Sequence, residues 1–582
     1  MNNSRALIKQ RKTQIILGLI LLLSLALRMQ GLDWDGGNFY HPDERSIYMR
    51  AECMHLTLTE QPGWQSCQNR DFPKDAPGLP GVSVFFDKDA SPLNPHWFPL
   101  GSIIIYLLVA VRFGLDFFME EIRLQDLATA GRIIAALVDT ISVAFLFFLG
   151  RRLFGVATGL FAAALMGLMV INIQVSHFYR PESFVMLLAI MAFWWMLNVV
   201  EKRRLVDHIA LGLVIGVTFA FRGSSAPILA PLGLTYVYLI WKDYQDKGLW
   251  VVALRQNFTP VLLAFISSLF VFLILQPYAL LDFHKYFGDL GWETGIARTA
   301  GLVPYTLQYV GTTRTGLYEL QQTIVWALGI PLGLLAWGGL VATTVHALKK
   351  PAYKNWLLLS WVLFLLVGVI PFFEVKFLRY VIPVLPVMVL FGSYWYVQLY
   401  YQIRKKSHFG AYLVWVTGAL VLLLTFFYAI SFVGIYKQSH PGIQASEWIN
   451  ANARSGDFLI TDNHWDEGFP NLGKFSVVQL PMYEQDSLRK VTEITNLLSD
   501  ADYIMSYSNR PWGSIARLPD RYPYSSAYYH ALFSGELGYE LYVKSSDSKK
   551  LYDIIFSEGK KFNMVHCGMH AMDIMRMESG FL

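Results

Sequence analysis

The stretch GRIIAALVDTISVAFLFFLGRRLFGVATGLFAAALMGLMVINIQV, residues 131–175, decides the fold class. It holds two apolar runs, 131–150 and 155–175, which the basic pair Arg151 and Arg152 separates. Each run is about 20 residues long, the length that a helix needs to cross the hydrocarbon core of a bilayer. Two such runs joined by a short basic turn predict a hairpin of transmembrane helices.

The same pattern extends over most of the chain. Of its 582 residues, 54% are hydrophobic and 16% are charged, and the mean hydropathy is +0.37. A soluble globular chain carries about 25% charged residues. We therefore expect an α-helical polytopic membrane protein with about eleven spans. They are predicted at residues 13–30, 131–150, 155–175, 181–200, 206–221, 226–241, 257–276, 323–345, 355–373, 379–400 and 411–436.

The first of these runs follows a basic N-terminus, as the apolar part of a signal peptide does. It has no small-x-small cleavage site and ends at Arg28, so we interpret it as an uncleaved span.

Lysine and arginine residues gather in every second loop between the predicted spans. Cytoplasmic loops carry this excess, so we expect a multi-pass protein of the inner (plasma) membrane with its N-terminus inside and its C-terminus outside. The basic loops contain Arg5, Lys9, Arg11 and Lys12; Arg151 and Arg152; Lys202, Arg203 and Arg204; Lys242 and Lys247; Lys349, Lys350 and Lys354; and Arg404, Lys405 and Lys406.

One apolar segment does not fit this alternation. Residues 97–115 (WFPLGSIIIYLLVAVRFGL) are apolar enough to span, but counting them would place the basic loops that follow them outside. We interpret the segment as an interfacial or re-entrant helix on the outer side of the membrane.

Two domains are predicted. Residues 1–436 form a membrane module with long outer loops at 31–130 and 277–322, and residues 437–582 form a soluble extracytoplasmic domain. In the latter, short apolar strands alternate with helices, which predicts a small α/β domain with a largely parallel sheet. The strands are expected at 457–461, 475–480, 503–506 and 539–543, and the helices near 442–453 and 485–498. This domain has no Gly-rich phosphate loop, so a nucleotide site is unsupported. No nucleic-acid partner is expected.

The first candidate site residues lie in the first outer loop, within GLDWDGGNFYHPDERSIY (31–48). Asp43 and Glu44 follow the first span by about a dozen residues, and His41 stands beside them. A carboxylate near the interface can act as the general base for a hydroxyl nucleophile, and a histidine can position it. The alternative is a solvated acidic loop with a structural histidine.

The second group is QVSHFYRPESF (174–184), where the third span reaches the outer face. Glu182 begins a span, where the helix dipole alone would favour a carboxylate, but ionisable groups at membrane depth are functional candidates by default. His177 and Arg180 lie beside it, and Asp43 is predicted to face the same side. Two carboxylates and a histidine form only a weak pattern for a divalent metal.

The third group is FFEVKFLRYVIPVLP (372–386), in which Lys376 and Arg379 lie outside, against the usual charge bias. A phosphate held by the two-pronged donor of an arginine would compensate them. The alternatives are pairing with Glu374 or with lipid headgroups. Arg222, in AFRGSSAP at another outer helix end, is a weaker candidate of the same type.

The order of these motifs resembles that of a known family. HPDE is followed by NPHWFPLGS, GRRLFG, SHFYRPES, QPYALLDF, PYTLQYVGT and KFLRYVIPVLP, and then by HWDEGFP and RYPYSSAYYHALFSGELGYEL. Over most of its length, the chain resembles the GT-C superfamily of polyprenyl-phosphate-sugar-dependent glycosyltransferases. Within it, the chain is most similar to the bacterial relatives of the dolichyl-phosphate-mannose–protein mannosyltransferases and of the lipid A aminoarabinose transferase.

The resemblance implies roles for individual residues. Asp43 resembles the catalytic acid of the first loop, Glu44 completes the acidic pair, and Glu182 takes the place of a second outer acid that is usually Asp. Arg379 resembles the arginine that meets the carrier phosphate. His96 stands where related transferases often have Lys. The end of the chain, CGMHAMDIMRMESGFL (567–582), departs from the family pattern.

The function implied is the inverting transfer of a hexosyl or pentosyl sugar from a polyprenyl-phosphate donor to an acceptor hydroxyl. The lipid tail of the donor lies along the helices, among the membrane lipid, and the acceptor is a protein, a lipid or a glycan. No cofactor is required, and a divalent metal is optional. The rival class is a lipid or glycolipid transporter or flippase. Transporters carry broken helices and buried charges along a mid-membrane path, whereas the unusual charges noted above lie at outer helix ends.

Cys53 and Cys67 both lie in the first outer loop. In a compartment that permits disulfides they could pair, and two free thiols are the alternative.

Overall fold

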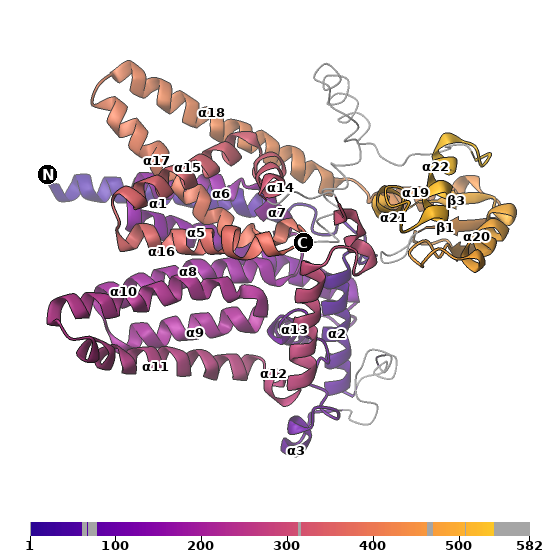
Figure 1. Cartoon of the computed structure of the whole chain (residues 1–582), viewed down its shortest axis with the longest axis horizontal. Helices are drawn as coiled ribbons and strands as arrows, with labels where there is room; N and C mark the ends of the chain where they lie inside the picture. The colour runs from indigo at the N-terminus through magenta and orange to yellow at the C-terminus, as the bar shows by residue number, and fades with distance from the viewer. Residues whose placement is uncertain are drawn as a thin grey trace.

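In this computed structural model, the described residues are 2–60, 67, 78–311, 316–462, 469–506 and 508–539. Most of them belong to a bundle of long helices that lie side by side (Figure 1). The bundle consists of α1 (Asn2–Met29), α5 (Leu124–Phe154), α6 (Val156–Gly167), α7 (Val170–Ser176), α8 (Pro181–Lys202), α9 (Leu205–Phe221), α10 (Leu229–Lys247), α11 (Trp250–Leu275), α15 (Ile330–Lys349), α16 (Tyr353–Leu363), α17 (Leu385–Arg404) and α18 (His408–Val433).

The predicted class of multi-pass membrane protein is confirmed. In the part of the chain that the structure describes, nine helical segments are long and apolar enough to cross a membrane. The number becomes ten if α6 and α7, which are bent by 58° at their junction, form one span. The span expected at 206–221 corresponds to α9, which has 17 residues and is shorter than each of these nine segments. The count of eleven therefore remains a prediction.

The segment 97–115 does not form a full span. Its helix, α4 (Ser102–Leu115), has 14 residues, too few to cross a bilayer. The chain before it passes close to the end of α9, where Gly101 donates a backbone hydrogen bond to the carbonyl of Phe221 at 3.0 Å. A Cβ at Gly101 would lie 1.7 Å from the carbonyl oxygen of Ala220, so only glycine permits this approach.

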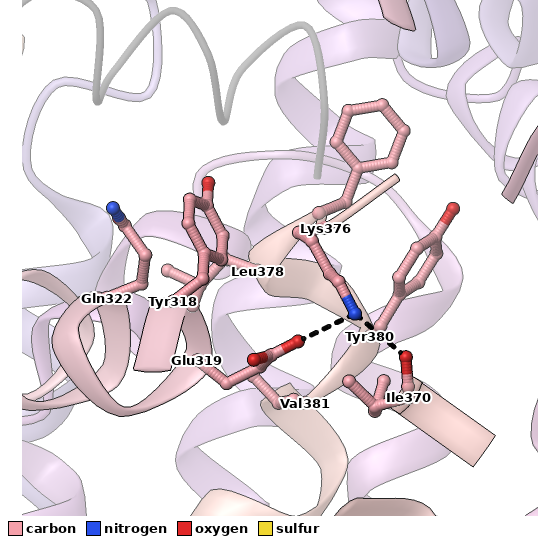
Figure 2. A pocket seen from close by; sticks show the side chains of 9 residues that line it. Tyr318, Glu319, Gln322, Ile370, Lys376, Leu378, Tyr380 and Val381 are labelled. Atoms are coloured by element: carbon pink, nitrogen blue, oxygen red, sulfur yellow. Dashed lines mark hydrogen bonds and ion pairs between the residues drawn. The ribbon is translucent and has the colours of Figure 1, made fainter. Parts of the chain in front are cut away.

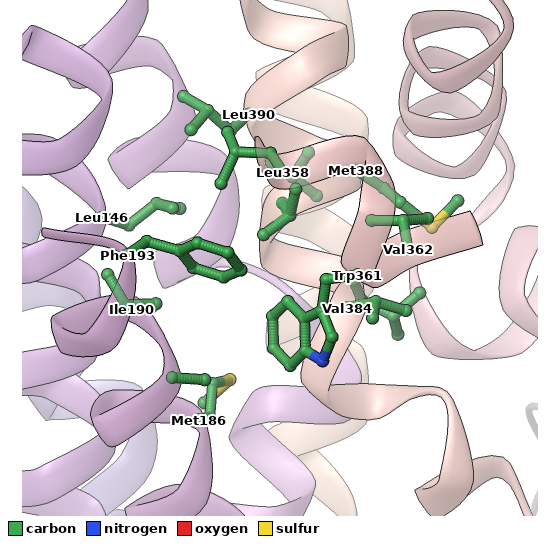
Figure 3. Packing of buried hydrophobic residues seen from close by; sticks show 14 of the residues in the cluster. Leu146, Met186, Ile190, Phe193, Leu358, Trp361, Val362, Val384, Met388 and Leu390 are labelled. Carbon is green, nitrogen blue, oxygen red and sulfur yellow. The ribbon is translucent and has the colours of Figure 1, made fainter. Parts of the chain in front are cut away.

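The main hydrophobic core joins two halves of the bundle (Figure 3). Leu146, Ile190 and Phe193 from α5 and α8 meet Trp361 and Met388 from α16 and α17, and the rings of Phe193 and Trp361 lie 5.1 Å apart. Small residues bring helices still closer: a Cβ on Gly339 of α15 would lie 2.2 Å from the backbone nitrogen of Gly392 on α17. Close backbone contact at small residues is a common way for membrane helices to associate.

A fully buried ion pair supports the break between α6 and α7. Arg28 of α1 lies 2.5 Å from Asp139 of α5, and neither side chain is exposed. The same guanidinium donates to the carbonyls of Gly167 at 2.8 Å and Met166 at 3.4 Å, and Asn172 donates to Asp139 at 3.0 Å. The last carbonyls of a helix lack intrahelical partners, so Arg28 satisfies those that the break leaves open.

Shorter elements gather at the end of the bundle that is predicted to face outward, where α2 and α13 run across the ends of the long helices (Figure 1). The α-helices here are α2 (Pro42–Leu58), α3 (Val82–Phe86), α12 (Tyr278–Leu281), α13 (Phe283–Arg298) and α14 (Leu317–Gln321). The 3-10 helices are η2 (Gly223–Ile228), η3 (Pro304–Tyr309), η6 (Ile370–Phe372), η7 (Leu378–Tyr380), η8 (Ile382–Val384) and η9 (Gly434–Lys437), and the π-helices are η4 (Gln322–Ala327) and η5 (Phe364–Val369).

Beyond η9 the chain forms a small sheet with helices around it. The three strands are parallel, in the order β2-β1-β3, and they agree with three of the four strands expected. The fourth, at 539–543, lies outside the described residues except for Tyr539. The elements are α19 (Pro441–Asn452), β1 (Phe458–Thr461), β2 (Ser476–Gln479), α20 (Leu488–Asp500), β3 (Tyr503–Met505), α21 (Asn509–Ile515) and α22 (Pro523–Ser534). Arg521 donates to the carbonyl of Gly301 at 3.2 Å and so connects this part to the loop after α13.

A disulfide joins Cys53 of α2 to Cys67, 14 residues further along the chain. Replacing both cysteines by alanine should lower the free energy of unfolding by about 3 kcal/mol, because the bond restricts a loop of this length in the unfolded chain. Chemical denaturation in detergent micelles measures the change. Alkylation of both thiols in the folded, unreduced wild-type protein would contradict the pairing.

His177, directly after α7, connects three parts of the bundle. Its side chain is fully buried, with Nδ1 at 2.7 Å from the carbonyl oxygen of Ile173 and Nε2 at 2.9 Å from that of Gln30. Its ring stacks on Tyr436 with the centroids 3.8 Å apart. Burial lowers the pKa of His177 to about 4.

This burial predicts a pH dependence of stability. In the unfolded chain His177 binds a proton below pH about 6.5. In the folded chain it does so only as the pH approaches 4. Stability should therefore fall as the pH drops from 6.5 towards 4, by roughly 2 kcal/mol at pH 5. Denaturation of the wild type and of His177→Gln at pH 7 and pH 5 measures this component. An equal loss in both proteins would contradict it.

Candidate functional site

The HPDE motif forms the beginning of α2. His41 is the N-cap residue, and its Nδ1 accepts a hydrogen bond from the backbone N–H of Glu44 at 3.2 Å. Pro42 occupies the first helical turn, where its missing N–H costs nothing. Asp43 and Glu44 also lie in this turn, where the helix dipole favours negative charge. The motif therefore fixes the direction in which each carboxylate points.

Glu44 points into the protein. Arg132 of α5 donates to both of its carboxylate oxygens at 3.0 Å, the hydroxyl of Tyr48 donates to it, and so does the backbone N–H of Tyr179 at 2.8 Å. The same guanidinium pairs with Asp35 at 2.7 Å. Glu44 was expected to complete a catalytic acidic pair. The structure gives it a different role: its buried carboxylate attaches α2 to α5.

Asp43 points towards two arginines. Its Oδ2 lies 3.0 Å from Nη2 of Arg180 and 3.6 Å from Nη1 of Arg379. Its side chain is 32% exposed, compared with 1% for Glu44 and 3% for Glu182. Of the three acids predicted from the sequence, Asp43 is therefore the one that a substrate can reach.

Glu182, at the start of α8, pairs with two neighbouring cations. Its Oε1 pairs with Arg180 at 3.0 Å and with Arg222, which also donates to Ser224 at 2.9 Å. Glu182 thus orients guanidiniums around Asp43 and does not itself face open space. The structure brings six of the predicted residues into one group, which we call the Asp43 cluster: His41, Asp43, Arg180, Glu182, Arg222 and Arg379.

His41 is a positioning residue within this cluster. It is 1% exposed, and Nη1 of Arg180 lies 3.3 Å from its Nε2. Burial, followed by the charges of Arg180 and Arg379, holds the pKa of His41 well below its ordinary value. The buried ring therefore lies between the start of α2, which it contacts through Nδ1, and Arg180, which it contacts through Nε2.

Arg379 lies in the segment between α16 and α17, which is anchored at several points. Its guanidinium is 4.5 Å from the ring centre of Phe377. Glu374, its alternative partner, accepts a hydrogen bond from the backbone N–H of Ala300 at 2.9 Å. The N–H of Val375 donates to the carbonyl of Ala297 at 3.1 Å. These bonds attach the segment to the end of α13.

Lys376 forms a further anchor of this segment. Its Nζ lies 3.2 Å from Glu319 of α14 and donates to the carbonyl of Ile370 at 3.0 Å (Figure 2). The Lys376 side chain is 2% exposed. It was expected to bind substrate. The structure places it in a buried ion pair that fixes the backbone three residues before Arg379.

Two other predicted binding residues lie outside the cluster. His96 is beside Asn94, at 3.2 Å, and 3.9 Å from Asp282 at the beginning of α13. His177 is buried against backbone carbonyls, as described above. His177 was selected from the sequence for its residue type next to an outer helix end, and His96 from the family resemblance; neither criterion shows the direction of a side chain.

Sequence reasoning missed Glu293, on α13. This half-buried carboxylate interacts electrostatically with Arg379, Asp43 and Arg222. Burial raises the pKa of Glu293, and Asp43 adds to this effect while Arg379 opposes it. The only sequence feature that pointed to Glu293 was its place, as an acid, in an aromatic-rich outer loop. This was not enough, because the sequence did not show that α13 crosses the end of the bundle. In the described ranges, no group of three or more His, Cys, Asp or Glu residues has the arrangement of a metal site.

Comparison with known proteins supports the expected family for the membrane part. Residues 117–274, from before α5 to the end of α11, match the family described as dolichyl-phosphate-mannose-protein mannosyltransferase. This segment contains Arg132, Arg180, Glu182 and Arg222. Among solved structures, the chain is similar to the archaeal oligosaccharyltransferase AglB from Archaeoglobus fulgidus, determined with an inhibitory peptide and a dolichol-phosphate. The TM-score is 0.52 at 12% identity, covering 89% of this chain and 72% of that one.

The end of the chain matches a different family. Residues 527–582 match the family described as GCVT N-terminal domain. The chain is 30% identical over 92 residues to 4-methylaminobutanoate oxidase (formaldehyde-forming) from Paenarthrobacter nicotinovorans, covering 16% of this chain and 11% of that protein. It is 40% identical over 47 residues to aminomethyltransferase from Shouchella clausii, covering 8% and 13%. The chain thus spans only 11–13% of the length of these relatives.

This second match changes the interpretation of two motifs. RYPYSSAYYHALFSGELGYEL, which contributed to the GT-C resemblance, overlaps the second match from residue 527 onward. CGMHAMDIMRMESGFL, which departs from the GT-C pattern, lies entirely within it. The GT-C resemblance is confirmed by the family match at 117–274 and by the shared fold. We conclude that the chain is a multi-pass membrane protein with a GT-C-like fold, in which residues 117–274 match the dolichyl-phosphate-mannose-protein mannosyltransferase family.

Proposed function

We propose that the protein is a membrane glycosyltransferase that moves a sugar from a polyprenyl-phosphate donor to an acceptor hydroxyl at the outer membrane face, with inversion of configuration. The acceptor hydroxyl belongs to a protein, a lipid or a glycan. The family match over α5 to α11 and the shared GT-C fold support this class of reaction. The basic loops at the opposite end of the bundle support the outward orientation of the Asp43 cluster.

The exposure of Asp43 is the observation that carries the proposal. A general base must come within hydrogen-bond reach of the hydroxyl that it deprotonates. The carboxylate of Asp43 is 32% exposed, whereas Glu44 and Glu182 are buried in ion pairs. Its Oδ2 lies 3.0 Å from Nη2 of Arg180 and 3.6 Å from Nη1 of Arg379, so the fold holds the carboxylate in one orientation.

The reaction is a single displacement. Asp43 takes the proton of the acceptor hydroxyl, whose oxygen attacks the anomeric carbon. The bond between that carbon and the phosphate oxygen breaks, its electron pair stays on the oxygen, and polyprenyl phosphate leaves. Arg379 stabilises the charge that develops on the phosphate, since preorganised donors near developing charge contribute strongly to catalysis. Arg180 and Arg222 both pair with Glu182, and Arg180 also lies closer to Asp43 than Arg379 does, so we assign the leaving group to Arg379.

The broken α6–α7 segment and the charges of Arg28 and Asp139 would suit a transporter. These two residues, however, neutralise each other, and Arg28 also donates to the open carbonyls of α6. A structural role accounts for them, and the remaining unusual charges gather at one end of the bundle. The transferase is therefore the better-supported function.

Asp43→Asn should bind donor normally and lose 10²–10⁴-fold in turnover, because the amide keeps its contact with the arginines but accepts no proton. Turnover with a labelled polyprenyl-phosphate sugar and equilibrium donor binding are measured on the same preparation. Glu293→Gln is the matched control, since it removes a neighbouring carboxylate, and it should lose less than tenfold. Normal turnover in Asp43→Asn with loss in Glu293→Gln would move the base to Glu293.

Donor affinity should depend on the shape as well as the charge of Arg379. Arg379→Lys keeps the charge but loses the planar two-pronged donor, so affinity should fall moderately, and Arg379→Ala should reduce it severely. Glu374→Gln is the control and should leave donor affinity unchanged, because Glu374 accepts the N–H of Ala300. Donor binding by all three variants gives the comparison. Equal affinities throughout would remove Arg379 from the donor site.

A further inference from the structure

A cavity of about 630 Å³ lies at the corner where α11 passes into α12 and α13. The residues that line it are Lys88, Asp89, His96, Leu281, Asp282, Phe283, His284 and Lys285. In Figure 1, α12 and α3 occupy this corner, at the edge of the bundle. We call this cavity the α12 pocket. The proposed transfer reaction assigns no role to it.

The position of the α12 pocket relative to the membrane follows from α11. This span is among the least buried in the bundle, and Phe265, Phe270 and Ile274 project from it with exposed fractions of 63%, 63% and 58%. A span with so much exposed apolar surface faces lipid. Because α11 ends at Leu275, the residues that line the pocket a few positions later lie at headgroup depth.

The polar lining of the pocket contains amines whose present ion pairs are weak. Lys88 pairs with Asp89 at 2.6 Å and Lys285 with Asp289 at 2.6 Å, and the two lysine side chains are 48% and 46% exposed. Exposed pairs of this kind contribute little, so both amines are able to turn towards another anion. Asp282, in contrast, accepts a hydrogen bond from Asn94 at 3.1 Å and is 10% exposed.

Exposed apolar side chains stand next to the lining residues. Phe283 itself is 50% exposed, its ring lies 4.4 Å from that of Phe287, which is also 50% exposed, and Leu280, directly before the lining residue Leu281, is 60% exposed. Aromatic side chains beside lysines are typical of the membrane interface. A ligand here therefore meets cations at one end and apolar surface at the other, which suits an amphiphile better than a free anion.

We propose that the α12 pocket binds the phosphate headgroup of a membrane glycerophospholipid, with the acyl chains lying along the exposed side of α11. Lys88 and Lys285 contact the phosphate, and Phe283 packs against the glycerol and upper acyl region. The site is separate from the Asp43 cluster: Glu293, which interacts with Asp43, is eight residues beyond Lys285 on α13, or about 12 Å along the helix.

Native mass spectrometry of the full chain released from detergent micelles tests this proposal. Titration with phosphatidylglycerol should give one retained lipid, and diacylglycerol, which lacks the phosphate, should be retained at least tenfold more weakly. The double variant Lys88→Gln, Lys285→Gln should weaken phosphatidylglycerol retention at least tenfold. Lys437→Gln, which removes an exposed lysine at the end of η9, is the matched control and should have no effect.

A second variant tests the cavity itself without changing charge. Leu281→Trp places a larger side chain in the lining and should displace the lipid, with thermal unfolding measured in parallel to establish that the variant folds. Equal retention of phosphatidylglycerol and diacylglycerol would overturn the proposal, as would unchanged retention in the lysine and tryptophan variants. If inorganic phosphate competed with an affinity equal to that of phosphatidylglycerol, the pocket would be a site for free anions. If polyprenyl phosphate bound tenfold more tightly than phosphatidylglycerol, the pocket would be part of the donor's route. Either result would overturn the proposal. Because retention is measured without turnover, failure of the transferase proposal would not affect the outcome.

Discussion

The buried contact between Arg132 and Glu44 determines how the candidate site is built. Arg132 sits in the span α5 and holds Glu44 and Asp35 of the first loop, as well as the carbonyl of Leu32 at 2.7 Å. Removing one partner from a buried pair of this kind typically costs 3–5 kcal/mol, because the other charge is left uncompensated. Neighbouring residues on a helix point about 100° apart. With Glu44 fixed inward, Asp43 is directed towards Arg180 and Arg379.

The cluster around Asp43 combines a reachable carboxylate with cations that the fold already holds in place. Glu182 pairs with two of the three guanidiniums, and the third belongs to Arg379. The backbone of Arg379 is fixed by the buried Lys376–Glu319 pair and by the hydrogen bonds to the end of α13. These contacts place the cation before any ligand arrives, which reduces the reorganisation that charge stabilisation would otherwise require.

Much of this arrangement could be predicted from residue order and charge. Charge bias and loop position located Asp43, Arg180, Glu182 and Arg379 correctly at one end of the bundle, because topology alone decides which loops share a face. Topology does not decide direction. Glu44 and Lys376 resemble their neighbours in sequence but turn inward to partners, Arg132 and Glu319, that lie 88 and 57 positions away in the chain.

The remaining differences have the same physical origin. Glu293 was missed because the path of α13 across the bundle is set by tertiary contacts that no local pattern encodes. The bend between α6 and α7 depends on Arg28, which comes from another helix and satisfies the open carbonyls. The family match at 527–582 likewise could not be predicted from periodicity. In the sequence it was visible only as a departure of residues 567–582 from the GT-C pattern.

The stereochemistry of transfer tests the central claim most directly, because a single displacement with Asp43 as base has only one outcome. Purified protein is incubated with a polyprenyl-phosphate sugar of known anomeric configuration and a membrane extract that supplies acceptors. The configuration of the new glycosidic bond is then determined by NMR. The account predicts the anomer opposite to that of the donor, with release of polyprenyl phosphate. A product that retains the donor configuration, or a donor that stays intact while it crosses the membrane, would contradict it.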